Sequence, residues 1–174
     1  HSGAYDFKVI FIAEGSSCRF PYSDLKTESV QNTILSRNNS GVDALNYLGV
    51  SKYEFYNLPC GRLDQVALIE INKIIELEIK NYKPDVIFTH SENDTNNDHR
   101  IFFKSTLIAT RPGSTGFVRN LFSYEVLSSS EWNFDQPFKP NYFQQLSEEN
   151  IEKKWKALNM YKTEIKKFPY PRSF

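Results

Sequence analysis

Short apolar runs alternate along this chain with longer segments whose apolar residues recur at helical spacing. The runs are rich in β-branched and aromatic residues and lead into polar loops, which is typical of strands in an α/β sheet. Residues 7–13 and 86–88 hold so few polar side chains that we expect both strands to be buried. The predicted strands are 7–13, 53–56, 86–88 and 118–126.

Helical spacing predicts four segments between and after these strands. The first covers 23–48 with a break near Asn38–Gly41, where four turn-forming residues follow one another, and Gly49 suits its C-terminal end. The order β-α-β-α-β suits right-handed crossovers and a mostly parallel sheet, so the predicted fold class is α/β. The other predicted helices are 65–82, 98–110 and a last helix with Ser147 as its N-cap.

Length and composition narrow the class of protein. The 174 residues suit a single domain, residues 1–174, with a hydrophobic core of its own. The 21 basic and 21 acidic residues cancel, which argues against a nucleic-acid binder, because such proteins need a basic surface. No apolar run approaches the roughly 20 residues of a membrane span. Cys18 and Cys60 either pair or stay thiols in a reducing compartment; we favour the second, which predicts a cytoplasmic protein.

The most polar loop follows the third predicted strand. It holds His90 and His99, two of the three histidines, with Asp94, Asn96 and Asp98 between them. In one interpretation His99 is a metal ligand and a neighbouring group such as Asp98 orients its ring. In the other, which is equally favoured, Asp98 caps the next helix and His99 is a residue of its first turn. We favour a structural role for His90. Asp94 and Asn96 either orient water or substrate, or stiffen the turn.

Polar loops follow the other predicted strands as well. In a parallel sheet such loops share one edge, so we expect them to converge on a single crevice for a polar ligand. In the first loop, Gly15–Ser17 either cradles an anion with its backbone N–H groups or forms a plain turn, which is the interpretation we favour. The converging loops carry Arg19, Arg62 with Asp64, residues 90–99 and Ser128–Trp132.

The segment Pro84–His90, with Asp94, Asn96 and Asp98-His99-Arg100, closely resembles the PIG-L/LmbE-type deacetylases. The resemblance implies a Rossmann-like three-layer sandwich and a zinc-dependent enzyme that removes acetyl groups from N-acetylglucosamine-type sugars. It covers nearly the whole chain and points to a bacterial branch tied to surface-sugar biosynthesis. Further similar segments are 11–15, 110–112, 123–126, 128–132, 140–143 and 171–173.

The resemblance also implies roles for single residues. His99 is expected to be a protein ligand of zinc or another divalent metal. Asn96 stands where several relatives carry a histidine proposed to stabilise the tetrahedral intermediate, and an amide can donate a hydrogen bond but cannot be a cationic acid. Asp98 is expected to tune a neighbouring polar group or brace the metal loop. Sugar contacts are expected from Arg19, Asp64 and Asp94.

One family motif does not occur in this sequence. The family's first strand ends in His-Pro-Asp-Asp-Glu, which supplies two zinc ligands and the general base. His1-Ser2-Gly3 resembles the tail of the helix after that motif, so we expect a piece truncated at both ends and lacking its first β-α unit. We expect this piece alone to be inactive, because one imidazole does not assemble a tight zinc site.

The sequence therefore leads to a metal-activated water attacking the acetamide of an acetylated amino sugar. Two other classes stay open. One is a sugar- or nucleotide-sugar-binding module without catalysis, and the other is a metal-dependent esterase. The sequence does not separate N-deacetylation from O-deacetylation or select the sugar acceptor.

Overall fold

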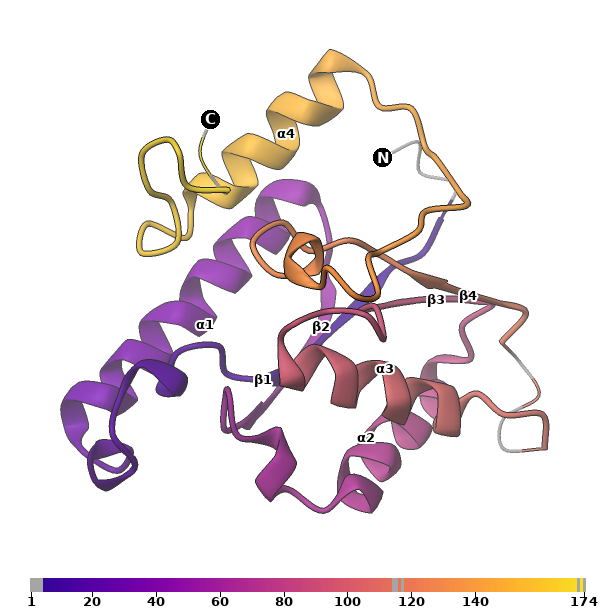
Figure 1. Ribbon diagram of the computed structural model, residues 1–174, viewed down its shortest axis with the longest axis horizontal. Coiled ribbons are helices and arrows are strands. Elements are labelled where there is room, and N and C mark those ends of the chain that lie inside the picture. The colour runs from indigo at the N-terminus through magenta and orange to yellow at the C-terminus, as the bar shows by residue number, and fades with distance from the viewer. Residues whose placement is uncertain (1–4, 114–115, 117, 172, 174) are drawn as a thin grey trace. The chain divides into compact units, whose positions relative to one another are not determined.

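The computed structural model describes residues 5–113, 116, 118–171 and 173 (Figure 1). The chain divides into two compact units, which are described one at a time. Unit 1 contains residues 1–60 and 141–174, and unit 2 contains residues 61–140. The expectation for His1-Ser2-Gly3 and the resemblance at Arg172 lie outside the described residues.

The sheet of unit 1 has two parallel strands, β1 (Lys8–Ala13) and β2 (Lys52–Leu58). Phe11 faces Phe55 in the register, and their rings stack with centroids 4.5 Å apart. Within β1 only Ile12 is fully buried, so the prediction of a buried strand was too strong. A two-stranded ribbon leaves most of its side chains partly open to solvent.

Helix α1 (Glu28–Leu48) is continuous, so the predicted break near Asn38–Gly41 was wrong. The turn-forming residues of this segment stay helical because the helix packs against β2, with Gly41 buried at the contact. A Cβ at Gly41 would lie 3.1 Å from Tyr161 Oη and 3.2 Å from Phe55 Cζ. The glycine thus serves close approach rather than a turn. Gly49 ends the helix in the left-handed conformation, as predicted.

The last helix, α4 (Glu148–Asn159), packs against α1 within unit 1. It begins as predicted, since the Ser147 side chain accepts a hydrogen bond from Asn150 N. Its acidic first turn complements the helix dipole. The helix ends at Asn159.

The sheet of unit 2 pairs β3 (Val86–Thr89) with β4 (Asn120–Ser123), again in parallel. Strand β4 is shorter than the predicted run of 118–126. Strand β3 is not buried as expected, because Phe88 is 61% exposed and stacks on Phe122 of the neighbouring strand. Among the described residues β3 pairs with β4 alone, so the sheet of unit 2 is a two-stranded ribbon.

Helices α2 (Leu68–Tyr82) and α3 (Asn97–Ala109) pack against each other in unit 2. The buried stripe of α2 recurs every four residues through Ile71, Ile75 and Ile79. The predicted start of α2 at residue 65 was early, because a 3₁₀ turn at Leu63–Gln65 comes first. Further 3₁₀ turns are Ser17–Arg19, Tyr22–Asp24 and Ser130–Trp132.

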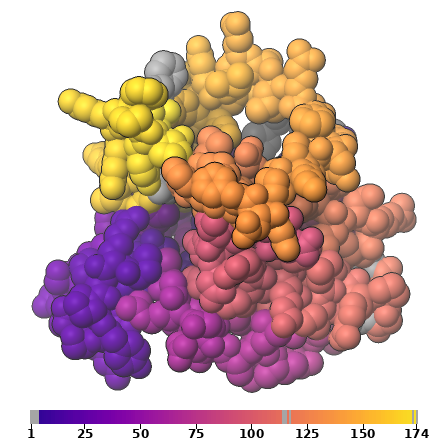
Figure 2. Space-filling model, in the orientation of Figure 1, coloured from indigo at the N-terminus to yellow at the C-terminus, as the bar shows by residue number. Residues whose placement is uncertain are grey.

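The fold is α/β with parallel strands, as the sequence predicts. The segment after β4 lies at the surface (orange in Figure 2) and exposes Trp132 and Phe134. Among the described residues no helix combines the length and apolar character needed to cross a membrane. Neither Cys18 nor Cys60 forms a disulfide.

Candidate functional site

The polar loop between β3 and α3 folds around the N-terminus of α3. Asn96 is the N-cap, and its side-chain oxygen accepts a hydrogen bond from Asp98 N at 2.9 Å. The cap is therefore Asn96 rather than Asp98. Its use of Oδ1 turns the other end of the amide, Nδ2, toward His99 Nε2 at 3.3 Å. The cap thus fixes both the start of the helix and a donor beside the imidazole.

His99, in the first turn of α3, is bonded through both ring nitrogens. Its Nδ1 lies 2.9 Å from Asp94 Oδ2, and because an ionised carboxylate only accepts, the imidazole is the donor. The side chain of His99 is 18% exposed, whereas that of Asp94 is 0% exposed. His99 Nε2 then carries the lone pair, which the Asn96 amide contacts.

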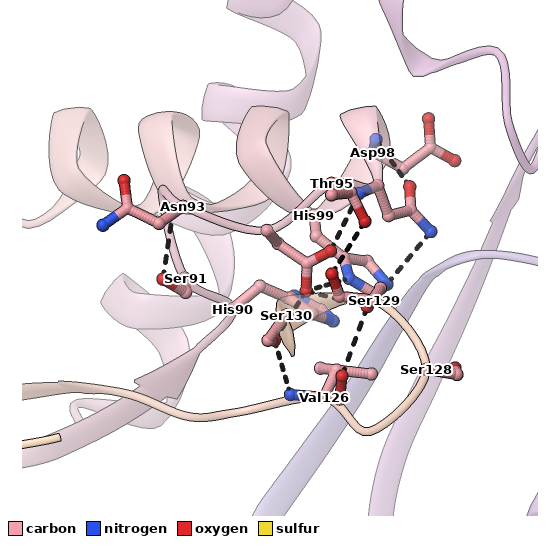
Figure 3. A network of polar contacts seen from close by, with 12 residues as sticks. His90, Ser91, Asn93, Thr95, Asp98, His99, Val126, Ser128, Ser129 and Ser130 are labelled. Atoms are coloured by element: carbon pink, nitrogen blue, oxygen red, sulfur yellow. Dashed lines mark hydrogen bonds and ion pairs between the residues drawn. The ribbon is translucent and has the colours of Figure 1, made fainter. Parts of the chain in front are cut away.

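The buried carboxylate of Asp94 collects hydrogen bonds from two loops (Figure 3). Its Oδ2 accepts from Ser129 Oγ at 2.9 Å and Ser130 Oγ at 3.0 Å, and its Oδ1 accepts from Asn96 N at 2.8 Å. Burial raises the pKa of Asp94, but hydrogen bonds from His99, the Asn96 backbone and Ser129 outweigh it, so the pKa is lowered. Asp94 is therefore held as a carboxylate.

His90, at the end of β3, stacks on His99 with ring centroids 4.1 Å apart and planes 21° from parallel. Phe102 stacks on the His90 ring at 5.5 Å, and Tyr124 Oη lies 3.4 Å from His90 Nε2. Burial lowers the pKa of His90 to about 4, and repulsion from a charge on His99 acts in the same direction. The negative charge of Asp94 raises this pKa, but its effect is smaller. His90 is thus a neutral ring packed against the His99 imidazole.

Asp98 faces away from this cluster and braces another loop of unit 2. Its carboxylate accepts backbone hydrogen bonds from Gly61 N at 2.5 Å and Leu63 N at 3.2 Å. The side chain is buried, so the two N–H groups satisfy a charge that solvent does not reach. Of the two roles expected for Asp98, the geometry favours bracing.

The expected sugar contacts have other protein partners. In unit 1, Arg19 Nη2 lies 2.5 Å from Oε1 of the buried Glu164, and Arg37 Nη1 lies 2.6 Å from the same oxygen. The hydrogen bond to the Glu164 carboxylate raises the pKa of Arg19. Partial burial lowers this pKa, but its effect is smaller. In unit 2, Asp64 is exposed and accepts a hydrogen bond from Gln65 Nε2. Their role as sugar contacts stays a prediction.

The Gly15–Ser17 loop of unit 1 has the geometry of a turn rather than an anion cradle. Ser16 N and Ser17 N both point at the buried carboxylate of Glu14, at 2.6 and 3.0 Å from Oε2. Cys60 N donates to Oε1 of the same group at 2.9 Å. Glu14 already occupies the N–H groups that an external anion would need.

The donor chemistry around His99 fits one position of a metal site. Metal-binding histidines commonly donate their second ring N–H to a carboxylate, which orients the ring and raises its basicity. Asp94 does this here, and it leaves His99 Nε2 as the atom that would bind a metal. Among the described residues no group of three His, Cys, Asp or Glu is placed to hold an ion.

The family model for PIG-L, GlcNAc-PI de-N-acetylase, matches residues 3–110, which are more than half of the chain. The chain belongs to the PIG-L family. The matched region of this PIG-L protein includes β3 and the loop with Asp94 and His99. A comparison with curated proteins by sequence found no match.

Solved structures similar to this PIG-L protein share its fold at low sequence identity. A conserved protein from Thermus thermophilus has a TM-score of 0.62 at 17% identity, over 90% of this chain and 78% of that one. The 4-carboxy-2-hydroxymuconate hydratase from Pseudomonas putida has a TM-score of 0.66 at 19% identity, over 91% and 67%. The N,N'-diacetylchitobiose deacetylase from Pyrococcus horikoshii, complexed with an inhibitor, has a TM-score of 0.58 at 15% identity, over 90% and 70%.

Sequence reasoning missed the part played by Ser129 and Ser130. The segment Ser128–Trp132 was predicted to line a crevice as a whole, without a role for either hydroxyl. The available signal was two neighbouring serines in the loop that follows β4, the strand that pairs with β3. Only the fold reveals that both hydroxyls meet Asp94.

Proposed function

We propose that this PIG-L protein takes part in removing an acetyl group from an N-acetylglucosamine-type sugar or conjugate, with water as the nucleophile. The observation that carries the proposal is the imidazole of His99, oriented by the buried Asp94 carboxylate at 2.9 Å with Nε2 left as a ligand atom. Membership of the family and a fold shared with a chitobiose deacetylase support the choice of reaction.

A divalent metal, zinc in the first instance, would supply Lewis acidity and lower the pKa of a bound water toward about 7. In this chain His99 Nε2 would hold it. Two further protein ligands and a general base are needed for the reaction, and the His-Pro-Asp-Asp-Glu motif that provides them in the family does not occur among these 174 residues. We therefore assign no residue of this chain as the general base.

The other residues of the loop would act on orientation and on charge. Asp94 would keep the His99 ring in one orientation, and His90 would hold one face of that ring without adding charge. Asn96 Nδ2, fixed by the N-cap beside His99, would donate to an oxygen near the metal once Nε2 is engaged. A neutral amide donor stabilises developing negative charge without a proton transfer.

The proposal is tested by acetate and free-amine release from N-acetylglucosamine and N,N'-diacetylchitobiose. A protein that contains this chain together with a His-Pro-Asp-Asp-Glu unit would be stripped with a chelator, assayed, and assayed again after zinc or another divalent metal is returned. We expect release only with metal, and loss of at least a hundredfold in His99→Ala, which removes the ligand. Release that survives in His99→Ala would overturn the assignment of His99.

The shared fold also contains a hydratase, so the fold does not select the reaction by itself. Hydration adds water across a double bond and frees no acetate, so the same assay separates the two reactions. A sugar-binding module without catalysis would bind the saccharides and release nothing. An esterase would release acetate from O-acetyl sugars alone.

A further inference from the structure

We propose that Ser129 and Ser130 are positioning residues for His99, acting through Asp94 to fix the imidazole in the tautomer that leaves Nε2 unprotonated. Both serine hydroxyls donate to Asp94 Oδ2, the oxygen that His99 Nδ1 also bonds. The link to catalysis rests on the proposed function, whereas the effect on the tautomer is a property of the chain alone.

The direction of the Ser130 hydroxyl follows from its neighbours. Val126 N donates to Ser130 Oγ at 2.8 Å, so the oxygen is used as an acceptor and its own hydrogen turns to Asp94 Oδ2 at 3.0 Å. Ser130 is 0% exposed, so no solvent competes for this bond. The result is a chain of donors from the backbone of Val126 through Ser130 to the carboxylate.

Ser129 reaches the same oxygen from the same turn. Its Oγ lies 2.9 Å from Asp94 Oδ2 and 3.4 Å from Val126 O, so the carboxylate is the better acceptor. The Ser129 carbonyl in turn accepts from Thr95 Oγ1 at 2.7 Å, which ties the turn to the loop of Asp94. Figure 3 shows Ser129, Ser130 and His99 gathered in this network.

The backbone of the turn is held in an uncommon conformation. Ser128 has a φ of 91°, a left-handed value that residues other than glycine rarely adopt. Its N–H donates to Glu131 Oε1 at 2.7 Å, which stabilises the turn that presents Ser129 and Ser130. Such strain persists where the surroundings determine the conformation, and here it delivers two hydroxyls to one oxygen.

These contacts have a consequence for the imidazole. Asp94 Oδ2 receives hydrogens from both serines and stays an acceptor, so His99 Nδ1 must be the donor. On the other side the Asn96 amide donates toward His99 Nε2. Without the two hydroxyls, Asp94 is still held by Asn96 N at Oδ1, but Oδ2 can take water in place of the serines, which weakens the hold on the tautomer.

The test is the imidazole ¹⁵N spectrum of His99 in the metal-free protein, at a pH above the ordinary histidine pKa of about 6.5. We expect wild type to show Nδ1 protonated, and the single variants Ser129→Ala and Ser130→Ala and their double variant to show a growing share of the other tautomer. In a protein that also contains the His-Pro-Asp-Asp-Glu unit, we expect zinc affinity to fall about tenfold in the double variant. Ser129→Thr, which keeps a hydroxyl, should restore the wild-type spectrum.

Ser105→Ala is the matched control. Ser105 is also 0% exposed, lies on α3, and its hydroxyl has no hydrogen-bond partner among the described residues, so its loss should change neither tautomer nor zinc affinity. A wild-type tautomer in both single variants overturns the proposal, even if the double variant does not fold. If the tautomer shifts while the wild-type protein releases no acetate from any saccharide, the proposed function fails and the positioning role stands.

Discussion

His99, in the first turn of α3, bonds Asp94 in the loop before the helix, with the imidazole Nδ1 2.9 Å from the carboxylate Oδ2. The partner that orients the ring is thus five residues before it, and it is the most deeply buried acid of the loop. The neighbouring Asp98, which the sequence places beside the histidine, points instead at the backbone of Gly61 and Leu63.

In a protein that contains this chain together with a His-Pro-Asp-Asp-Glu unit, Asp94→Asn should weaken zinc binding 10- to 100-fold, because an amide no longer accepts from His99 Nδ1 with a full charge. The change should also lower the free energy of unfolding by about 3 kcal/mol, since the hydroxyls of Ser129 and Ser130 would face an amide in a buried site. Zinc competition with a chromophoric chelator and urea unfolding measure the two effects. Asp64→Asn, at an exposed position, is the control and should change neither. Unchanged zinc affinity in Asp94→Asn would contradict the orienting role.

Asn96→Ala should reduce the free energy of unfolding by about 1 kcal/mol, because the N-cap bond to Asp98 N is lost. It should also lower kcat more than it raises KM, since the amide donor beside His99 disappears. Ser147→Ala removes the N-cap of α4 in unit 1 and serves as the matched control. If Ser147→Ala loses as much unfolding free energy as Asn96→Ala but keeps the wild-type kcat and KM, the kinetic change in Asn96→Ala is due to the lost amide donor and not to the lost cap. A wild-type kcat in Asn96→Ala would leave it a cap only.

Arg19 and Arg37 share one oxygen of the buried Glu164, yet we expect substitutions at the two arginines to differ. The Arg19 side chain is 45% exposed and that of Arg37 is 24% exposed, so solvent screens the first pair more. Arg19→Ala should cost less than about 1 kcal/mol of unfolding free energy, whereas Arg37→Ala should cost more. Thermal unfolding measures both. If Arg19 also contacts the sugar, its alanine variant should raise KM with little change in kcat.

The metal-free protein should lose stability as the pH falls from about 6.5 to about 4. The pKa of His90 is lowered to about 4 in the folded state, so over this range the unfolded chain binds a proton that the folded chain does not. The loss in unfolding free energy should reach about 3 kcal/mol at the low end. His90→Phe keeps a flat ring against His99 and should flatten the curve above pH 4. Urea unfolding at a series of pH values gives the comparison, and identical slopes would refute the assignment to His90.

The sequence by itself determined the elements and the loop that matters. Apolar periodicity located β1, β2, β3 and the three longer helices, and turn chemistry predicted the left-handed Gly49 and the Ser147 cap. These features depend on local propensity and on neighbours a few residues apart. The concentration of His, Asp and Asn in residues 90–99 likewise marked the candidate site.

Only the tertiary structure decided how those residues are used. Whether Gly41 breaks a helix or lets it approach a strand depends on Phe55 and Tyr161, which are distant in sequence. In the same way, Asp94 rather than Asp98 orients His99, because Ser129 and Ser130 arrive from the loop after β4. A residue's hydrogen-bond partners are set by the direction of its side chain in the folded protein. Spacing along the chain does not encode that direction when the partner lies more than thirty residues away.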